Sequence, residues 1–132
     1  SNPEKYEILP EVISKEPLGP AVRQGDDQWF QIVRWSLTAL IEAEELGITK
    51  ANVDQMRDQS TNPNVLRILG KGEDMGRGIG LDKDWSYRII KQVGNYGESW
   101  TKYFGPNSAL KLPRGLNNLW TKGGLMYAQP IR

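Results

Sequence analysis

The feature that most constrains the fold is a series of apolar residues at helical spacing between positions 29 and 41. Its members recur every three or four residues: Trp29, Ile32, Val33, Leu37, Leu40 and Ile41. They fall on one face of a helix, because an α-helix turns once in 3.6 residues. Asp26 or Asp27 can cap its N-terminus, and Gly47 is the expected C-cap. The pattern predicts one long helix that buries an apolar face.

The segments before this helix predict an α/β layer. Residues 6–13 and 21–24 read as extended segments, and Pro10 makes the first an edge or irregular strand. A strand that leads into a long helix is typical of α/β folds rather than of helical bundles.

Shorter helices are expected in the rest of the chain. They lie after Thr49, from Asn62 to Gly70, from residues 82–84 to Gly105, and around residues 114–121. Glycines at 94 and 97 weaken the third of these, as they would where another element approaches closely. The final segment, 107–132, is too apolar for a free tail, so we expect it to wrap over a core.

The composition narrows the possible chemistry. The 132 residues suffice for one domain and include no cysteine and no histidine. Disulfides, thiolate zinc sites, cysteine nucleophiles and Ser-His-Asp catalysis are therefore excluded within this chain. A formal net charge of +1 gives no overall field for nucleic acid. We expect a non-enzymatic protein that requires no cofactor or metal and binds no nucleic acid.

The glycine-rich segment 70–80 matches no phosphate-binding motif. A dinucleotide fingerprint requires Gly-x-Gly-x-x-Gly directly after a strand, but Met75 and Leu81 stand where the third glycine of either candidate would be. The spacing of a P-loop is also absent. We interpret the segment as a structural loop.

Three side-chain clusters have a functional and a structural interpretation. The acidic cluster Glu42, Glu44 and Glu45 could hold a cation, but we favour a solvated helix end. The aromatic series Trp85, Tyr96, Trp100 and Phe104 could stack bases or sugars, but we favour a packed core. The basic residues Lys111, Arg114 and Lys122 could bind an acidic partner, but we favour a solvated rim.

Long blocks of the sequence resemble a known family. Residues 11–29 and 43–49 resemble the general L-amino-acid-binding periplasmic proteins of polar amino-acid ABC importers. The similarity returns in residues 78–81, 85–98 and 114–128, so that it covers most of the chain. Runs of this length are far more specific than a short motif.

The resemblance implies a place within a two-lobe α/β binding protein. We expect a partial lobe that is helix-rich, with few strands and a long C-terminal extension. Residues 1–13 would be the end of the second lobe or its edge strand, and 14–20 a hinge crossing, with Lys15, Glu16 and Pro17 as hinge positions. Residues 21–48 would be a first-lobe strand and long helix, and 49–132 a helical extension packed on that lobe.

The resemblance also implies the function of the parent protein. Such proteins capture L-amino acids in the periplasm and deliver them to an ABC transporter permease. The family's arginine for the ligand carboxylate and aspartate for its ammonium have no counterpart in this sequence, so no ligand-binding residue is assigned. We expect the chain to be a C-terminal fragment without a signal peptide.

Two further expectations concern this chain alone. Open sheet edges and apolar surface predict a homodimer or a strand-exchanged oligomer. The alternative function is a stand-alone protein–protein interaction module derived from this lobe, without a ligand site.

Overall fold

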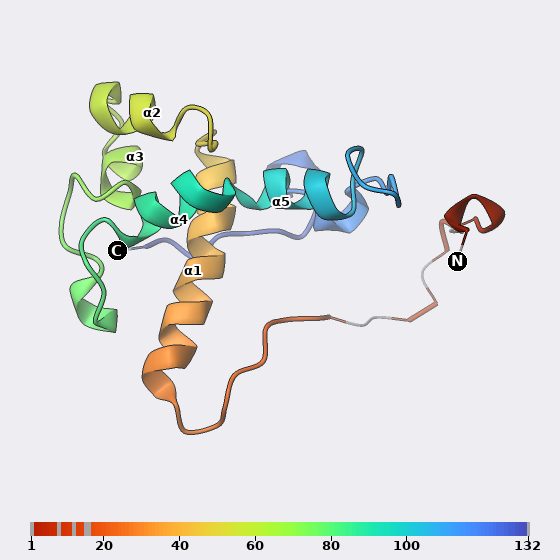
Figure 1. Ribbon diagram of the computed structural model, residues 1–132, viewed down its shortest axis with the longest axis horizontal. Helices are drawn as coiled ribbons and strands as arrows, with labels where there is room; N and C mark the ends of the chain where they lie inside the picture. Colours follow the sequence, from red (N-terminus) through yellow and green to blue (C-terminus); the bar gives the residue numbers. More distant parts are fainter. Residues whose placement is uncertain (1, 8, 12, 15–16, 132) are drawn as a thin grey trace.

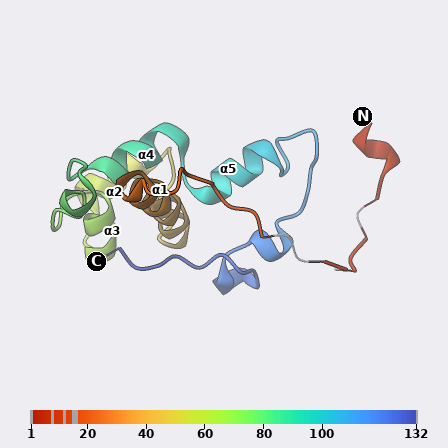
Figure 2. The ribbon, with the colours of Figure 1, turned by 90° about the horizontal axis from the view of Figure 1, so that it is seen from below.

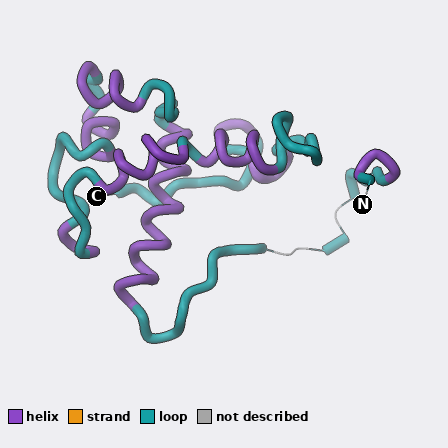
Figure 3. Tube along the Cα trace, in the orientation of Figure 1, coloured by secondary structure: helices purple, strands orange, loops and turns teal. Residues whose placement is uncertain are grey.

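The regular structure of the chain is helical (Figures 1 and 3). The computed structural model describes residues 2–7, 9–11, 13–14 and 17–131. Within them lie five α-helices: α1 (Asp27–Glu45), α2 (Val53–Gln59), α3 (Pro63–Ile68), α4 (Trp85–Val93) and α5 (Tyr96–Tyr103). Four 3-10 turns accompany them: η1 (Pro3–Lys5), η2 (Arg77–Ile79), η3 (Gly115–Asn117) and η4 (Trp120–Lys122).

The strands expected at 6–13 and 21–24 are not formed in the described part of either segment. The only pairing of extended backbone found among the described residues is an isolated parallel bridge between Leu119 and Met126. A strand exists only where its backbone groups bond to a neighbouring strand. Among the residues that the structure describes, no neighbouring strand lies beside these two segments, so local β-propensity alone does not produce a sheet.

Helix α1 forms where the apolar spacing predicts it. The Asp26 side chain caps it by accepting a hydrogen bond from the Trp29 backbone N–H at 3.1 Å. The helix ends before Gly47, whose φ of 69° reverses the chain direction. Helices α3, α4 and α5 lie against α1, whereas α2 packs on α3 and α4. The N-terminal half of α1 projects beyond α2, α3 and α5 (Figure 1).

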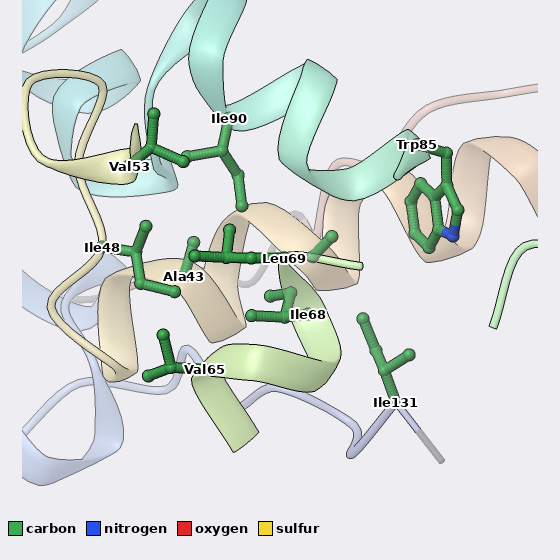
Figure 4. Close-up of a cluster of buried hydrophobic side chains, with 10 residues drawn as sticks. Ala43, Ile48, Val53, Val65, Ile68, Leu69, Trp85, Ile90 and Ile131 are labelled. Carbon is green, nitrogen blue, oxygen red and sulfur yellow. The ribbon is translucent and has the colours of Figure 1, made fainter. Parts of the chain in front are cut away.

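The buried face of α1 differs from the expected one. Its buried residues are Thr38, Ala39, Ile41 and Ala43, whereas 51% of Trp29 is exposed. Small side chains on α1 allow the backbones of α3 and α4 to approach closely, because the distance between two packed helices depends on the size of the residues at their contact. Figure 4 shows the resulting cluster, in which α1 supplies alanine and its neighbours supply isoleucine, leucine and valine.

The single helix expected between residues 82 and 105 is divided into α4 and α5. Gly94 has a φ of 80°, and Asn95 begins a new helix by accepting the Glu98 N–H at 2.9 Å. Glu98 in return accepts the Asn95 N–H, which completes a capping box. A Cβ on Gly97 would lie 2.7 Å from a Glu44 carboxylate oxygen, so the close approach expected near these glycines is confirmed.

The C-terminal segment packs on the helices, as its apolar content predicts. Leu119 and Ala128 join Ile41 of α1 in a second buried cluster, and Ile131 reaches the main one. The expected helix around 114–121 is replaced by η3 and η4. Seen from below, the part of this segment that follows η4 is extended and runs along one side of the helices (Figure 2). Among the described residues, no helix combines the length and the apolar character needed to cross a membrane.

Candidate functional site

The predicted hinge residues lie at the edge of what the structure describes. Lys15 and Glu16 are outside the described residues. Pro17 is exposed and begins an irregular segment, residues 17–25, which we call the arm. The hinge role of Lys15, Glu16 and Pro17 stays a prediction.

The arm has an extended course without backbone pairing. Within the described chain, residues 17–22 form no backbone hydrogen bond, and the first one is donated by the Asp26 N–H to the Arg23 carbonyl at 3.4 Å. Leu18 is 95% exposed. The arm leaves the N-terminal end of α1 and turns back beside it (Figure 1).

A groove of about 320 Å³ lies between the arm, α1 and the C-terminal segment, and we call it the arm groove. Its walls are mainly apolar, and 46% of Phe30 is exposed there. The lining residues are Pro20 and Val22 of the arm; Phe30, Val33, Arg34, Leu37, Thr38 and Ile41 of α1; and Tyr127 and Gln129.

One edge of the arm groove is polar and held in place. Arg34 donates a hydrogen bond to the Gln129 side-chain oxygen at 2.7 Å, and its guanidinium lies 5.6 Å from the ring centroid of Trp35. The hydrogen bond from Arg34 to Gln129 attaches the C-terminal segment to α1 at this edge. The groove is therefore an apolar surface with a polar rim, which is the pattern of a protein contact.

Two acidic residues of α1 tie the C-terminal segment to the helix. Glu45 accepts a hydrogen bond from the Ala128 N–H at 3.0 Å, and the backbone of Ile131 lies near the Glu42 carboxyl. The second carboxylate oxygen of Glu42 is buried and has no hydrogen-bond partner among the described residues. These contacts show that the interpretation of the acidic cluster as a solvated helix end is wrong for Glu42.

The environment of Glu42 favours its protonated form. Burial raises the pKa of its carboxyl from 4.5 to about 7, against the effect of the nearby Ile131 backbone, which lowers it. The nearby Glu45 carboxylate raises the pKa further, and Arg67 lowers it. A neutral Glu42 can thus lie between α1 and the C-terminal segment near neutral pH.

A largely buried ion pair makes a further tie. Arg114 donates to the two oxygens of Glu44 at 2.8 and 3.2 Å, with 17% and 10% of the two side chains exposed. Arg114 is therefore not part of a solvated rim, as the sequence suggested, whereas Lys111 and Lys122 are exposed. Because its guanidinium is already matched by a carboxylate, Arg114 is not free to bind an anionic ligand.

The glycine-rich loop has a structural role. A Cβ on Gly76 would lie 2.4 Å from the Asp82 carbonyl oxygen and 2.5 Å from that of Leu81. Met75, Ile79 and Leu81 pack against the core. Close backbone packing therefore accounts for glycine at position 76, and the interpretation as a structural loop is confirmed.

The aromatic series is mainly part of the interior. Trp85 is buried in the main cluster and Tyr96 packs on the second one. Trp100 lies 5.1 Å from Phe104 between ring centroids, and 47% of Phe104 is exposed. The core interpretation is confirmed for Trp85 and Tyr96. Figure 4 shows Trp85 beside Ile131 at the margin of the cluster.

No metal centre is assembled in the part of the chain that the structure describes, since no three acidic side chains gather there.

Sequence reasoning missed both the arm groove and the contact of Glu42 with the C-terminal segment. A second series of apolar residues on α1 could have revealed the groove: Phe30, Val33, Leu37 and Ile41.

The curated relatives of the chain are solute-binding proteins. It is 59% identical to the general L-amino acid-binding periplasmic protein AapJ of Rhizobium johnstonii over 99% of the chain. It is 54% identical to the putative amino-acid ABC transporter-binding protein YhdW of Escherichia coli over all of it. It is also 55% identical over 95% of the chain to the glutamate/glutamine/aspartate/asparagine-binding protein BztA of Rhodobacter capsulatus. No family model matches the chain.

A solved structure has the same fold over nearly the whole chain. It is an ABC transporter periplasmic binding protein from Brucella ovis with glutathione bound, 54% identical, with a TM-score of 0.92 over 99% of this chain. The chain covers 41% of that structure and 37–39% of the three curated relatives.

The homologues are therefore periplasmic binding proteins of amino-acid ABC transporters, and the chain spans about two-fifths of their length. The resemblance seen in the sequence is confirmed. The expected helix-rich partial lobe of a binding protein is confirmed as well, by the match in fold.

Proposed function

We propose that this chain is part of a periplasmic solute-binding protein that captures L-amino acids and delivers them to the permease of an ABC transporter. The observation that supports the proposal is 54–59% identity to three such proteins along almost the whole chain. The protein acts in the periplasm, and binding rather than catalysis is its role. The hinge at Lys15, Glu16 and Pro17 and the four expected segments belong to this proposal.

The amino-acid site lies mainly outside the residues of this chain. A zwitterion requires a cation for its carboxylate and a carboxylate for its ammonium group. Arg114 and Glu44 have that chemistry, but they pair with each other. The described residues therefore position the lobe, and the remaining length of the binding protein contributes the ligand contacts.

A chimera tests this function. The segment of AapJ that matches this chain is replaced by the chain, and binding is measured by calorimetry with glutamate, glutamine, aspartate, asparagine and glutathione. The names of two relatives and of the solved structure supply these probes. We expect micromolar or tighter binding of at least one amino acid to the chimera and no such binding to the chain alone.

Two results would contradict the proposal. A folded chimera that binds none of the probes would show that this chain does not support amino-acid capture. Micromolar binding by the chain alone would place the site within its own residues. The alternative of a stand-alone interaction module gains no support from the relatives, which are all named as binding proteins.

A further inference from the structure

A cavity lies between α1, the glycine-rich loop and the start of α4, and we call it the loop cavity. Its volume is about 350 Å³, which is within the range of small-molecule sites. None of the described residues that line it has a charged side chain, so a neutral molecule fits it better than an ion. The side chains of its walls are Gln31, Trp35, Met75, Ile79, Trp85 and Ile131.

The indole of Trp85 points to a ligand for this cavity. Only 4% of the residue is exposed, and its Nε1–H has no hydrogen-bond partner among the described residues. In Figure 4 this nitrogen lies on the side of the ring that is turned away from Leu69 and Ile90. A buried N–H without an acceptor costs free energy, because it loses its hydrogen bonds to water on folding. An acceptor brought into the cavity would recover that loss.

The second tryptophan of the cavity already has a partner. Trp35 donates its Nε1–H to the Gln31 side-chain oxygen at 3.1 Å. This hydrogen bond holds one wall in place, and the carboxamide nitrogen of Gln31 is a further donor. The lining therefore offers donors from Gln31 and Trp85, and a complementary ligand presents an acceptor oxygen.

The glycine-rich loop holds the opposite wall. The Asp74 carboxylate accepts the N–H groups of Gly76 and Arg77 at 3.1 and 3.2 Å. Met75 and Ile79 pack on the core, but both side chains are only partly buried. The wall is thus formed before a ligand arrives, as in most small-molecule sites, and solvent can reach it.

Water is a poor occupant of the loop cavity. A buried water molecule typically makes about three hydrogen bonds. Most side chains of the lining are apolar and offer it none. An aromatic ring, in contrast, gains contacts with the indoles of Trp35 and Trp85, because aromatic pairs attract one another beyond the area that they bury.

We infer that the loop cavity binds a neutral aromatic molecule with a carbonyl oxygen, to which Trp85 donates its Nε1–H. An amino-acid zwitterion does not fit here, since neither of its charges would find a partner in the lining. The cavity is built from residues of this chain, so the inference does not rest on the proposed function.

Two-dimensional proton–nitrogen NMR of the indole groups tests this site with acetophenone as the probe. Trp85→Phe identifies the Trp85 signal by its loss. We expect acetophenone to shift this signal saturably, with a Kd of about 1 mM or tighter. Benzoate, which adds a negative charge, should bind at least about tenfold more weakly, because no cation lines the cavity.

Two matched substitutions isolate the hydrogen bond. Trp85→Phe removes the donor and retains an aromatic ring. Trp100→Phe removes another buried indole N–H without a partner, at a residue that does not line the cavity. We expect Trp85→Phe to weaken acetophenone binding at least about threefold and the binding of ethylbenzene, which lacks the oxygen, by less than about twofold. Trp100→Phe should change neither.

Three results would overturn the inference. The first is the absence of a saturable shift of the Trp85 signal in the unsubstituted chain, which is informative whether or not the variants fold. The second is an equal effect of the two substitutions on acetophenone binding. The third is loss of acetophenone binding in the AapJ chimera, because another segment would then fill the cavity. Amino-acid binding by the chimera is measured separately, so either proposal can fail without the other.

Discussion

At the scale of single residues, acidic side chains of α1 determine how the C-terminal segment is held. Glu45 accepts the Ala128 N–H of that segment, Glu42 lies near the backbone of Ile131, and Glu44 pairs with Arg114. These three glutamates lie at the end of a helix, where negative charge is unfavourable to the helix dipole. Their tertiary partners offset that cost, so substitutions at these positions should lower the free energy of unfolding.

Glu42 should make stability depend on pH. Its pKa in the fold, about 7, exceeds the ordinary 4.5, so its stabilising contribution is complete below pH 4.5 and is lost as the pH rises through 7. Because Glu42 is only partly shielded from solvent, we expect a loss of about 1 kcal/mol between pH 5 and pH 8. Thermal melts across this range should show a falling Tm that Glu42→Gln flattens.

A surface variant is the control for this experiment. Glu73→Gln, at an exposed position in the glycine-rich loop, should retain the slope of the wild-type chain. The pKa of Asp54 is lowered, so its stabilising contribution is lost as the pH falls below 4. Asp54 therefore does not change the stability between pH 5 and pH 8. A Tm that rises between pH 5 and pH 8 would contradict the assignment to Glu42.

The Glu44–Arg114 pair should be strongly coupled. Each variant, Glu44→Gln or Arg114→Gln, leaves a largely buried group without its partner and should cost about 2–3 kcal/mol of unfolding free energy. Urea denaturation of both single variants and the double variant gives the coupling energy. Arg88→Gln, which removes an exposed ion pair with Asp82 and Asp84, should cost less. Additive losses at Glu44 and Arg114 would show that the pair is not coupled.

At the scale of elements, turns decide where the helices end. Gly94 and the Asn95–Glu98 capping box divide one apolar series into α4 and α5, and this division lets Gly97 approach Glu44. In the loop before α4, backbone rather than side chains fills the space, so that Gly76 lies against the carbonyls of Leu81 and Asp82.

Two alanine substitutions in this loop should differ sharply. Gly76→Ala places a Cβ within 2.4–2.5 Å of two carbonyl oxygens and should cost about 2 kcal/mol or more, because backbone must move. Gly78→Ala meets no atom within 4 Å and should change stability by less than about 0.5 kcal/mol. Chemical denaturation of both variants measures the difference. Equal stability of the two variants would show that the loop rearranges around the added methyl group without a loss of unfolding free energy.

At the scale of the whole molecule, the open arm groove should govern association. Apolar side chains and the unpaired backbone of residues 17–22 are accessible at this groove in the described chain. We therefore expect the isolated chain to form a homodimer or a strand-exchanged oligomer at high concentration. Light scattering should give twice the monomer mass or more, and Phe30→Gln should shift the equilibrium towards monomer while Phe104→Gln does not. A monomer at every accessible concentration would contradict this expectation.

The sequence alone determined the features that depend on neighbouring residues. The course of α1, its Asp26 cap and its end at Gly47 follow from local hydrogen bonds and a repeat of 3.6 residues. The Asn95–Glu98 capping box is equally local and could have revealed the boundary between α4 and α5. Long blocks of similarity pointed to the family, because they extend over most of the chain rather than over one short motif.

Only the tertiary structure decided which contacts those elements make. It buried Ala39 and Ala43 instead of Trp29, removed one carboxylate oxygen of Glu42 from solvent and matched Arg114 with a glutamate 70 residues away. It also left residues 21–24 without a strand. Each of these outcomes depends on a surface contributed from elsewhere, and side-chain spacing within a segment does not specify that surface. A helix completes its backbone hydrogen bonds within itself, whereas a strand or a buried charge needs a distant partner.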